Sequence, residues 1–117
     1  MPHCVIEYSS EVAEQVCVTE LMAAVYEAAF STGLFPEYHI KTRAVAYDHF
    51  RVGQTSDTFV HVNLHLLSGR DDGQKSDLSE KVLAGIESLL PKVGVVSVEI
   101  IDMHRASYRK RVLKSND

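Results

Sequence analysis

Pro2 is the residue of this sequence whose position offers unusual chemistry. Its structural interpretation is simple, because proline is tolerated as the first residue of a strand, where it has no ladder N–H to lose. A small second residue also permits removal of Met1, which would leave Pro2 with a free secondary amine. An amine in an apolar pocket loses hydration of its charged form, so its pKa falls and it can act as a base near neutral pH.

Other reactive side chains form no recognisable catalytic or metal-binding set. His61 and His65 are four residues apart on a predicted strand, which separates them by about 13 Å at about 3.3 Å per residue. One zinc ion cannot bind both at that distance, so we expect no metal site and expect surface or interface histidines instead. Cys4 has no identifiable base partner and is expected to be a buried thiol. Standard nucleotide-binding, metalloprotease and serine-hydrolase motifs are missing.

Composition predicts one folded domain over residues 1–117, with 45% hydrophobic and 24% charged residues. A net charge of -4 argues against nucleic acid or an anionic membrane as the main partner. No apolar run reaches the roughly 18 residues of a membrane span, and the N-terminus lacks the pattern of a signal peptide. Cys4 and Cys17 are expected to be reduced thiols of a cytoplasmic protein, although the sequence also allows one disulfide.

The first half of the sequence predicts a strand, a helix and a second strand. Residues 2–8 alternate in polarity, which indicates the first strand. Thr19 can cap a helix that Gly33 and Pro36 end. The apolar stripe of that helix consists of Leu21, Val25, Ala28 and Ala29. Residues 39–52 predict a long second strand.

The second half repeats this order without repeating the sequence. Alternation from Val60 to Leu67 indicates a strand, and the run Asp71-Asp72-Gly73 lies in the predicted loop after it. A helical stripe follows, formed by Leu78, Val82, Ile86 and Leu89. Pro91 and Gly94 end that helix, and Val95 to Ile101 predicts a fourth strand.

The predicted order is therefore β-α-β followed by β-α-β. Each strand-helix-strand unit suggests a parallel pair with a right-handed crossover. Two units can share one four-stranded sheet with both helices on one face, an α/β (α+β) arrangement that leaves the other face uncovered. Cys4, Ile6, Val98 and Ile100 can point to either face. An uncovered face favours association between copies of the chain.

Several short segments, taken in chain order, form a specific set. They are Met1-Pro2-His3, Val5-Ile6-Glu7, Thr32-Gly33-Leu34-Phe35-Pro36, Phe59-Val60-His61, Ser68-Gly69-Arg70 and Val98-Glu99-Ile100. Arg43 and His104 follow two of them. Through these segments the chain resembles the 5-carboxymethyl-2-hydroxymuconate isomerases of the tautomerase superfamily, from residue 2 to about residue 104.

The resemblance implies a tautomerase-like fold, a homotrimer, no cofactor, and Pro2 as the catalytic base for ketonising a carboxylate dienol. Carboxylates call for cationic side chains, and Arg70 stands at the glycine-arginine position of the family. Lys41 stands where the family typically has arginine, and Arg43 where it has a second one. Lysine keeps the charge but loses the bidentate fork. On a strand Lys41 and Arg43 share a face, so both could reach one pocket.

Two alternatives stay open beside the isomerase. Retention of Met1 would leave Pro2 as an amide without a basic nitrogen, which favours a non-catalytic, ligand-binding or interaction protein of the same fold. Residues 104–117 form a basic tail, expected at a subunit interface, whose cations could also bind nucleic acid weakly. The phosphate contacts of such a binder would weaken steeply with salt.

Overall fold

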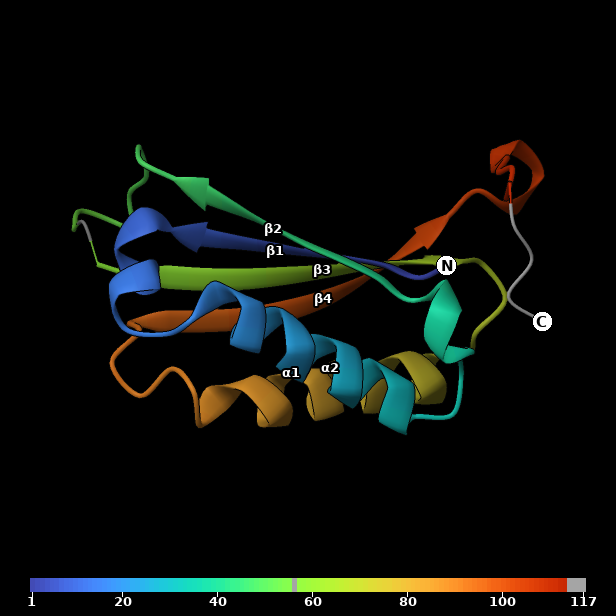
Figure 1. Cartoon of the computed structure of the whole chain (residues 1–117), viewed down its shortest axis with the longest axis horizontal. Coiled ribbons are helices and arrows are strands. Elements are labelled where there is room, and N and C mark those ends of the chain that lie inside the picture. Colours follow the sequence, from blue (N-terminus) through green and yellow to red (C-terminus); the bar gives the residue numbers. More distant parts are fainter. Residues whose placement is uncertain (56, 114–117) are drawn as a thin grey trace.

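Four strands form one mixed sheet in a computed structural model of the chain, which describes residues 1–55 and 57–113 (Figure 1). The strands are β1 (His3–Ser9), β2 (Lys41–Tyr47), β3 (Phe59–Leu67) and β4 (Val95–Met103). Their order is β2-β1-β3-β4; the outer pairs are parallel and the central β1–β3 pair is antiparallel. Helices α1 (Val18–Ser31) and α2 (Asp72–Glu87) lie together on one face, as predicted.

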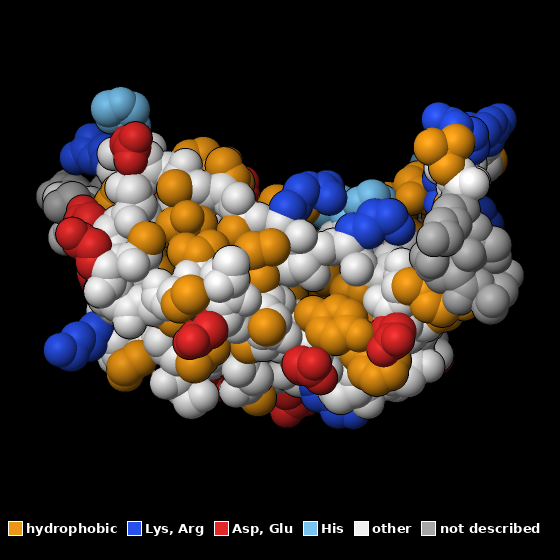
Figure 2. Space-filling model, in the orientation of Figure 1, with side chains coloured by type: hydrophobic (Ala, Val, Ile, Leu, Met, Phe, Trp, Pro, Cys, Tyr) orange, Lys and Arg blue, Asp and Glu red, His pale blue; other side chains and the backbone are white. Residues whose placement is uncertain are grey.

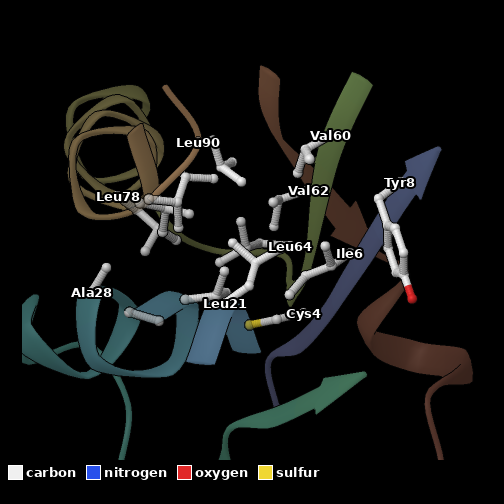
Figure 3. Close-up of a cluster of buried hydrophobic side chains, with 14 of the residues drawn as sticks. Cys4, Ile6, Tyr8, Leu21, Ala28, Val60, Val62, Leu64, Leu78 and Leu90 are labelled. Atoms are coloured by element: carbon white, nitrogen blue, oxygen red, sulfur yellow. The ribbon is translucent and has the colours of Figure 1, made fainter. Parts of the chain in front are cut away.

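The core lies between this face of the sheet and the two helices (Figure 3). Alternate residues of β1 and β3 point into it because successive strand side chains face opposite ways. Cys4 and Ile6, which the sequence allowed on either face, are fully buried there. The helices contribute Leu21, Val25, Leu78, Val82 and Ile86, all fully buried. Burial of such a side chain favours folding by about 1.5–3 kcal/mol.

Hydrogen-bonded polar side chains span the opposite face of the sheet. Glu7 on β1 accepts hydrogen bonds from the Tyr47 hydroxyl at 2.6 Å and from the Asn63 amide at 3.2 Å. His61 on β3 contacts Ser97 at 2.6 Å and Glu99 at 3.0 Å, both on β4. This face therefore links all four strands through polar contacts, and no helix of the described residues covers it.

β2 is shorter than the 39–52 segment that the sequence predicted. A 3-10 turn, Glu37–His39, occupies the residues directly before it, and the chain leaves the sheet after Tyr47. Beyond it, an isolated bridge between Val52 and Thr55 closes a turn. The prediction failed because β1, the strand that pairs with β2, ends at Ser9 opposite Tyr47, so residues 48–52 have no partner in the described sheet.

Two predicted helix boundaries were also wrong. The N-cap of α1 is Cys17 rather than Thr19, which lies inside the first turn. Helix α2 begins at Asp72, so Gly73 is helical instead of part of the loop. Asp71 and Gln74 form a reciprocal capping box that makes this early start favourable. None of the described helices is both long and apolar enough to cross a membrane.

Candidate active site

Pro2 is fully buried directly before β1, one residue outside the strand that the sequence predicted to begin with it. Its carbonyl accepts a hydrogen bond from the Lys41 backbone N–H at 3.0 Å, which ties it to the first residue of β2. With Met1 present, the Pro2 nitrogen is part of a peptide bond. The Met1 amine donates to the His39 carbonyl at 2.6 Å, and the Met1 sulfur accepts from the Leu67 N–H at 3.1 Å.

The surroundings of the chain terminus disfavour a charged amine. Burial, followed by a hydrogen bond and charge from Lys41 and by the charge of Lys110, lowers the pKa of the Met1 amine from 8.0 to about 5. The Lys41 ammonium donates to the same His39 carbonyl, at 3.2 Å, that the terminal amine uses. The Met1 amine is therefore mainly neutral at physiological pH.

Lys41 and Arg43 lie along the edge strand β2, beside the first residues of β1. The parallel register places Lys41 opposite His3 and Arg43 opposite Val5, and both cationic side chains are exposed. The Arg43 guanidinium contacts His3 Nδ1 at 3.2 Å. The pKa of His3 is lowered by burial, then by the charges of Arg43 and Lys41. Their described hydrogen bonds end on a carbonyl and an imidazole, so neither cation is neutralised by a carboxylate through these bonds.

Arg70 contacts a different segment, the loop that follows α1. Its guanidinium donates to the Leu34 carbonyl at 3.2 Å and lies 5.5 Å from the centre of the Phe35 ring. Phe35 is buried, so this contact holds a half-buried cation at the loop 32–36. The described contacts of Arg70 are with this loop, and those of Lys41 and Arg43 are with β1 and the turn before β2.

Sequence reasoning missed the side chains that fold back from the C-terminal segment. Arg105 donates through Nε and Nη2 to the Ser68 carbonyl, at 3.1 and 2.7 Å. Tyr108 then brings its hydroxyl to 3.1 Å from His3 Nε2, with the two rings in an edge-to-face arrangement. Neither contact has a local sequence signal, since the partners are 37 and 105 residues apart. Residues 114–117 of the predicted tail lie outside the described residues.

These contacts gather at one end of the sheet. The N-terminus, the turn before β2 and residues 104–113, which fold back as a C-terminal hook, lie near one another there (Figure 1). The space-filling view shows a hollow beside the hook with Lys, Arg and His side chains in it (Figure 2). Hydrogen-bond donors and positive charge around a neutral amine suit an anionic substrate that exchanges a proton.

Comparison with known families agrees with this arrangement. A sequence profile described as 5-carboxymethyl-2-hydroxymuconate isomerase matches residues 2–112, nearly the whole chain. A search of curated proteins finds no match.

Solved structures with the same fold are similar over most of their length. A 5-carboxymethyl-2-hydroxymuconate isomerase from Deinococcus radiodurans R1 superposes with a TM-score of 0.83 at 24% identity, over 94% of this chain and 88% of its own. A 5-carboxymethyl-2-hydroxymuconate delta-isomerase gives 0.78 at 18% identity, over 96% and 88%. A fused 4-OT wild-type symmetric trimer gives 0.71 at 19% identity, over 87% and 85%. At these identities the structures establish the fold.

Proposed function

The chain belongs to the 5-carboxymethyl-2-hydroxymuconate isomerase family, and from this membership we propose that it ketonises a 2-hydroxymuconate-type dienol with Pro2 as general base. It is thus an isomerase of tautomerase fold. The proposed substrate is 5-carboxymethyl-2-hydroxymuconate or a relative, in cytoplasmic catabolism of aromatic compounds. No cofactor enters the proposed reaction, because the step is a proton transfer within one molecule.

The proposed step moves one proton from oxygen to carbon. The Pro2 amine, freed by removal of Met1, takes the proton of the 2-hydroxyl group. The oxygen electrons form the carbonyl bond, the conjugated double bonds shift, and a carbon along the chain takes the proton back from the Pro2 ammonium. The amine is regenerated, so the cycle needs no other reactant.

The observation that carries this proposal is the environment of the chain terminus. Burial, Lys41 and Lys110 lower the pKa of the Met1 amine to about 5, and we propose that the same surroundings lower the pKa of the Pro2 amine once Met1 is removed. The Pro2 ring also fixes the direction of the nitrogen lone pair, because ring closure prevents rotation about the N–Cα bond. A neutral, directed amine is what repeated proton delivery to one carbon requires.

Cations at the two sides of the terminus are proposed to bind the substrate carboxylates. Lys41 donates to the same His39 carbonyl as the terminal amine, and Arg43 follows on the same strand. Arg70 is proposed to bind a second carboxylate near the loop 32–36, where its guanidinium lies over the Phe35 ring. Such charge-assisted bonds also stabilise negative charge that develops on oxygen during the reaction.

An ultraviolet ketonisation assay tests the proposal. The substrates are 2-hydroxymuconate and its carboxymethyl relative, and mass spectrometry establishes whether each preparation retains Met1. We expect processed chains to turn over and Met1-retaining chains to be inactive while equally folded, because an amide nitrogen is not a base. Pro2→Ala, which leaves a primary amine, should reduce activity. Equal rates for processed and Met1-retaining chains would exclude Pro2 as the base.

A non-catalytic ligand-binding or interaction protein is the second candidate, and the hydrogen bonds of Met1 favour it. The Met1 amine and sulfur each make a hydrogen bond, to His39 and from Leu67. A chain that keeps Met1 there would retain the surrounding cations but have no basic Pro2 nitrogen. Such a chain would bind the dicarboxylate without turnover, and the same preparations test this by calorimetry.

A further inference from the structure

We propose that Tyr108 is a substrate-binding residue whose hydroxyl donates a hydrogen bond to a substrate carboxylate, and that His3 is the positioning residue that directs it. The inference deepens the proposed function and rests on it. It adds a donor from the C-terminal segment to the cations of β2.

The direction of each hydrogen bond follows from Arg43. A guanidinium can only donate, so the 3.2 Å contact from Arg43 Nη1 requires His3 Nδ1 to accept with a lone pair. A neutral imidazole with an unprotonated Nδ1 carries its proton on Nε2. Nε2 lies 3.1 Å from the Tyr108 oxygen, so the imidazole donates to the phenol. The hydroxyl proton of Tyr108 is then not used in this bond and can be given to a ligand.

The neutral state of His3 agrees with its surroundings. Burial and the charges of Arg43, Lys41, the terminal amine and His65 lower its pKa. Among the described contacts His3 has no carboxylate to hold a second proton; its partners are a guanidinium and a phenol. The hydrogen bonds therefore run in one direction only: Arg43 donates to His3, and His3 donates to Tyr108.

Other contacts already hold the C-terminal segment in place. Arg105 donates twice to the Ser68 carbonyl, and His104 bonds the Ser107 hydroxyl at 2.8 Å. The Tyr108 ring packs edge-on against His3 and is half-buried. This packing uses the ring and not the hydroxyl group. A phenylalanine would keep that packing, so the packing does not require the hydroxyl, whose proton is available to a ligand.

Charge identifies the ligand as an anion. Lys41 and Lys110 are close enough to the chain terminus to lower the pKa of its amine, and Arg43 lies at the other side of His3. Tyr108 contacts His3, and the charges of Arg43 and Lys41 act on the same imidazole. A hydroxyl donor in such positively charged surroundings is best matched by a carboxylate, the group that the proposed substrates carry. Lys110 lies two residues after Tyr108, so one segment brings both a donor and a charge.

Binding and turnover of Tyr108→Phe, in processed protein, test the inference. cis,cis-Muconate is the probe, since it has two carboxylates but no 2-hydroxyl group and so reports binding without reaction. Calorimetry should give a Kd at least about tenfold weaker for Tyr108→Phe, the size expected for a hydrogen bond to a charged group. KM for the dienol should rise similarly while kcat changes little. Tyr47→Phe, which removes a hydroxyl bonded to Glu7 at the far end of β2, is the matched control.

A double-mutant cycle tests the part given to His3. If His3 acts through Tyr108, His3→Ala combined with Tyr108→Phe should weaken muconate binding no more than Tyr108→Phe alone. Nitrogen NMR of the imidazole should find Nδ1 unprotonated in wild type and in Tyr108→Phe. Additive losses, or a proton on Nδ1, would overturn the role of His3.

Failure of the inference differs from failure of the proposed function. Unchanged muconate affinity in folded Tyr108→Phe, or no muconate binding to the wild type, overturns the inference even if dienol turnover is normal. If the protein binds muconate in a Tyr108-dependent way but does not turn over the dienols, the inference is supported and the proposed reaction is excluded.

Discussion

Lys41 illustrates how one cation can disfavour the charged form of a neighbouring amine. Its ammonium and the terminal amine both donate to the His39 carbonyl, at 3.2 and 2.6 Å, so two positive groups would compete there. Loss of the proton from the amine relieves that repulsion. Burial is the main cause of the lowered pKa of this amine, and Lys41 and then Lys110 add to it.

The pH dependence of turnover is predicted from this arrangement. The neutral Pro2 amine is the active form, so kcat/KM should rise with pH and reach a plateau above the pKa of the amine. That inflection should lie below the ordinary α-amino value of about 8. Lys41→Met removes a cation, so the inflection should move to higher pH. Lys81→Met, on the exposed face of α2, is the control and should leave the profile unchanged. An unmoved inflection in Lys41→Met would mean that Lys41 does not contribute to the pKa of the Pro2 amine.

Arg70 has a structural contact with the loop 32–36 and a proposed role in substrate binding. Substrates with one or two carboxylates can separate these two roles. Arg70→Ala should slow turnover of a dicarboxylate dienol more than that of a monocarboxylate enol, by about 1.5–3 kcal/mol for the lost charge-assisted bond. The measurement is kcat/KM for both substrates. Equal losses would indicate that Arg70 acts only by holding Leu34 and Phe35 in place.

At the scale of elements, the short 3-10 turn before β2 determines which residue begins that strand. Because Glu37–His39 turns the chain, the first paired residue of β2 is Lys41, directly beside Pro2 and His3. The same turn presents the His39 carbonyl to the terminus. A longer β2 starting at residue 39, as the sequence predicted, would place that carbonyl within the sheet ladder.

The capping box of α2 gives a prediction about stability. Asp71 accepts from the Gln74 N–H at 2.8 Å, and the Gln74 side chain accepts from the Asp71 N–H at 3.0 Å. Asp71→Ala should lower the free energy of unfolding by about 1 kcal/mol. Denaturant unfolding at fixed protein concentration measures it. The control is Asp77→Ala, which removes an exposed ion pair with Lys81 and should cost about 0.5 kcal/mol or less. Similar losses for both would argue against the cap.

At the scale of the molecule, both helices cover one face of the sheet, and the opposite face has a network of polar contacts. Glu7, His61, Asn63 and Glu99 are connected across strands, and His61 and Asn63 are only partly exposed. If a partner chain covered this face, these polar groups would stay hydrogen-bonded to one another, so their burial would leave no donor or acceptor unsatisfied. A fused trimer shares this fold.

We predict a homotrimer in solution. The uncovered face and the small size of the chain both favour association, because a short chain buries a limited share of its surface by folding alone. Light scattering at micromolar concentration should give about three times the 13.1 kDa chain mass. A mass of one chain would contradict the prediction, and a dimer would count against it as well.

The sequence by itself determined the order of elements and much of the core. Period-two alternation in β1 and β3 and the helical stripe from Leu78 to Ile86 identify their own buried faces, because each pattern is set by local backbone geometry. The short segments quoted from residue 1 to residue 104 led to the family that the profile over residues 2–112 confirms. Pro2 was named from its position, and the cations Lys41, Arg43 and Arg70 were named from the resemblance to the family; their roles remain predictions.

Only the tertiary structure decided which of these side chains meet. The strand order places β1 between β2 and β3, so the Pro2 end of the chain lies beside Lys41 and Arg43, whereas Arg70 is held by the loop after α1. The contact of Tyr108 with His3 joins residues 105 apart, and no local pattern encodes it. Such contacts depend on the ends of strands and the path of the chain between them, and these are set by long-range pairing rather than by the residues nearby.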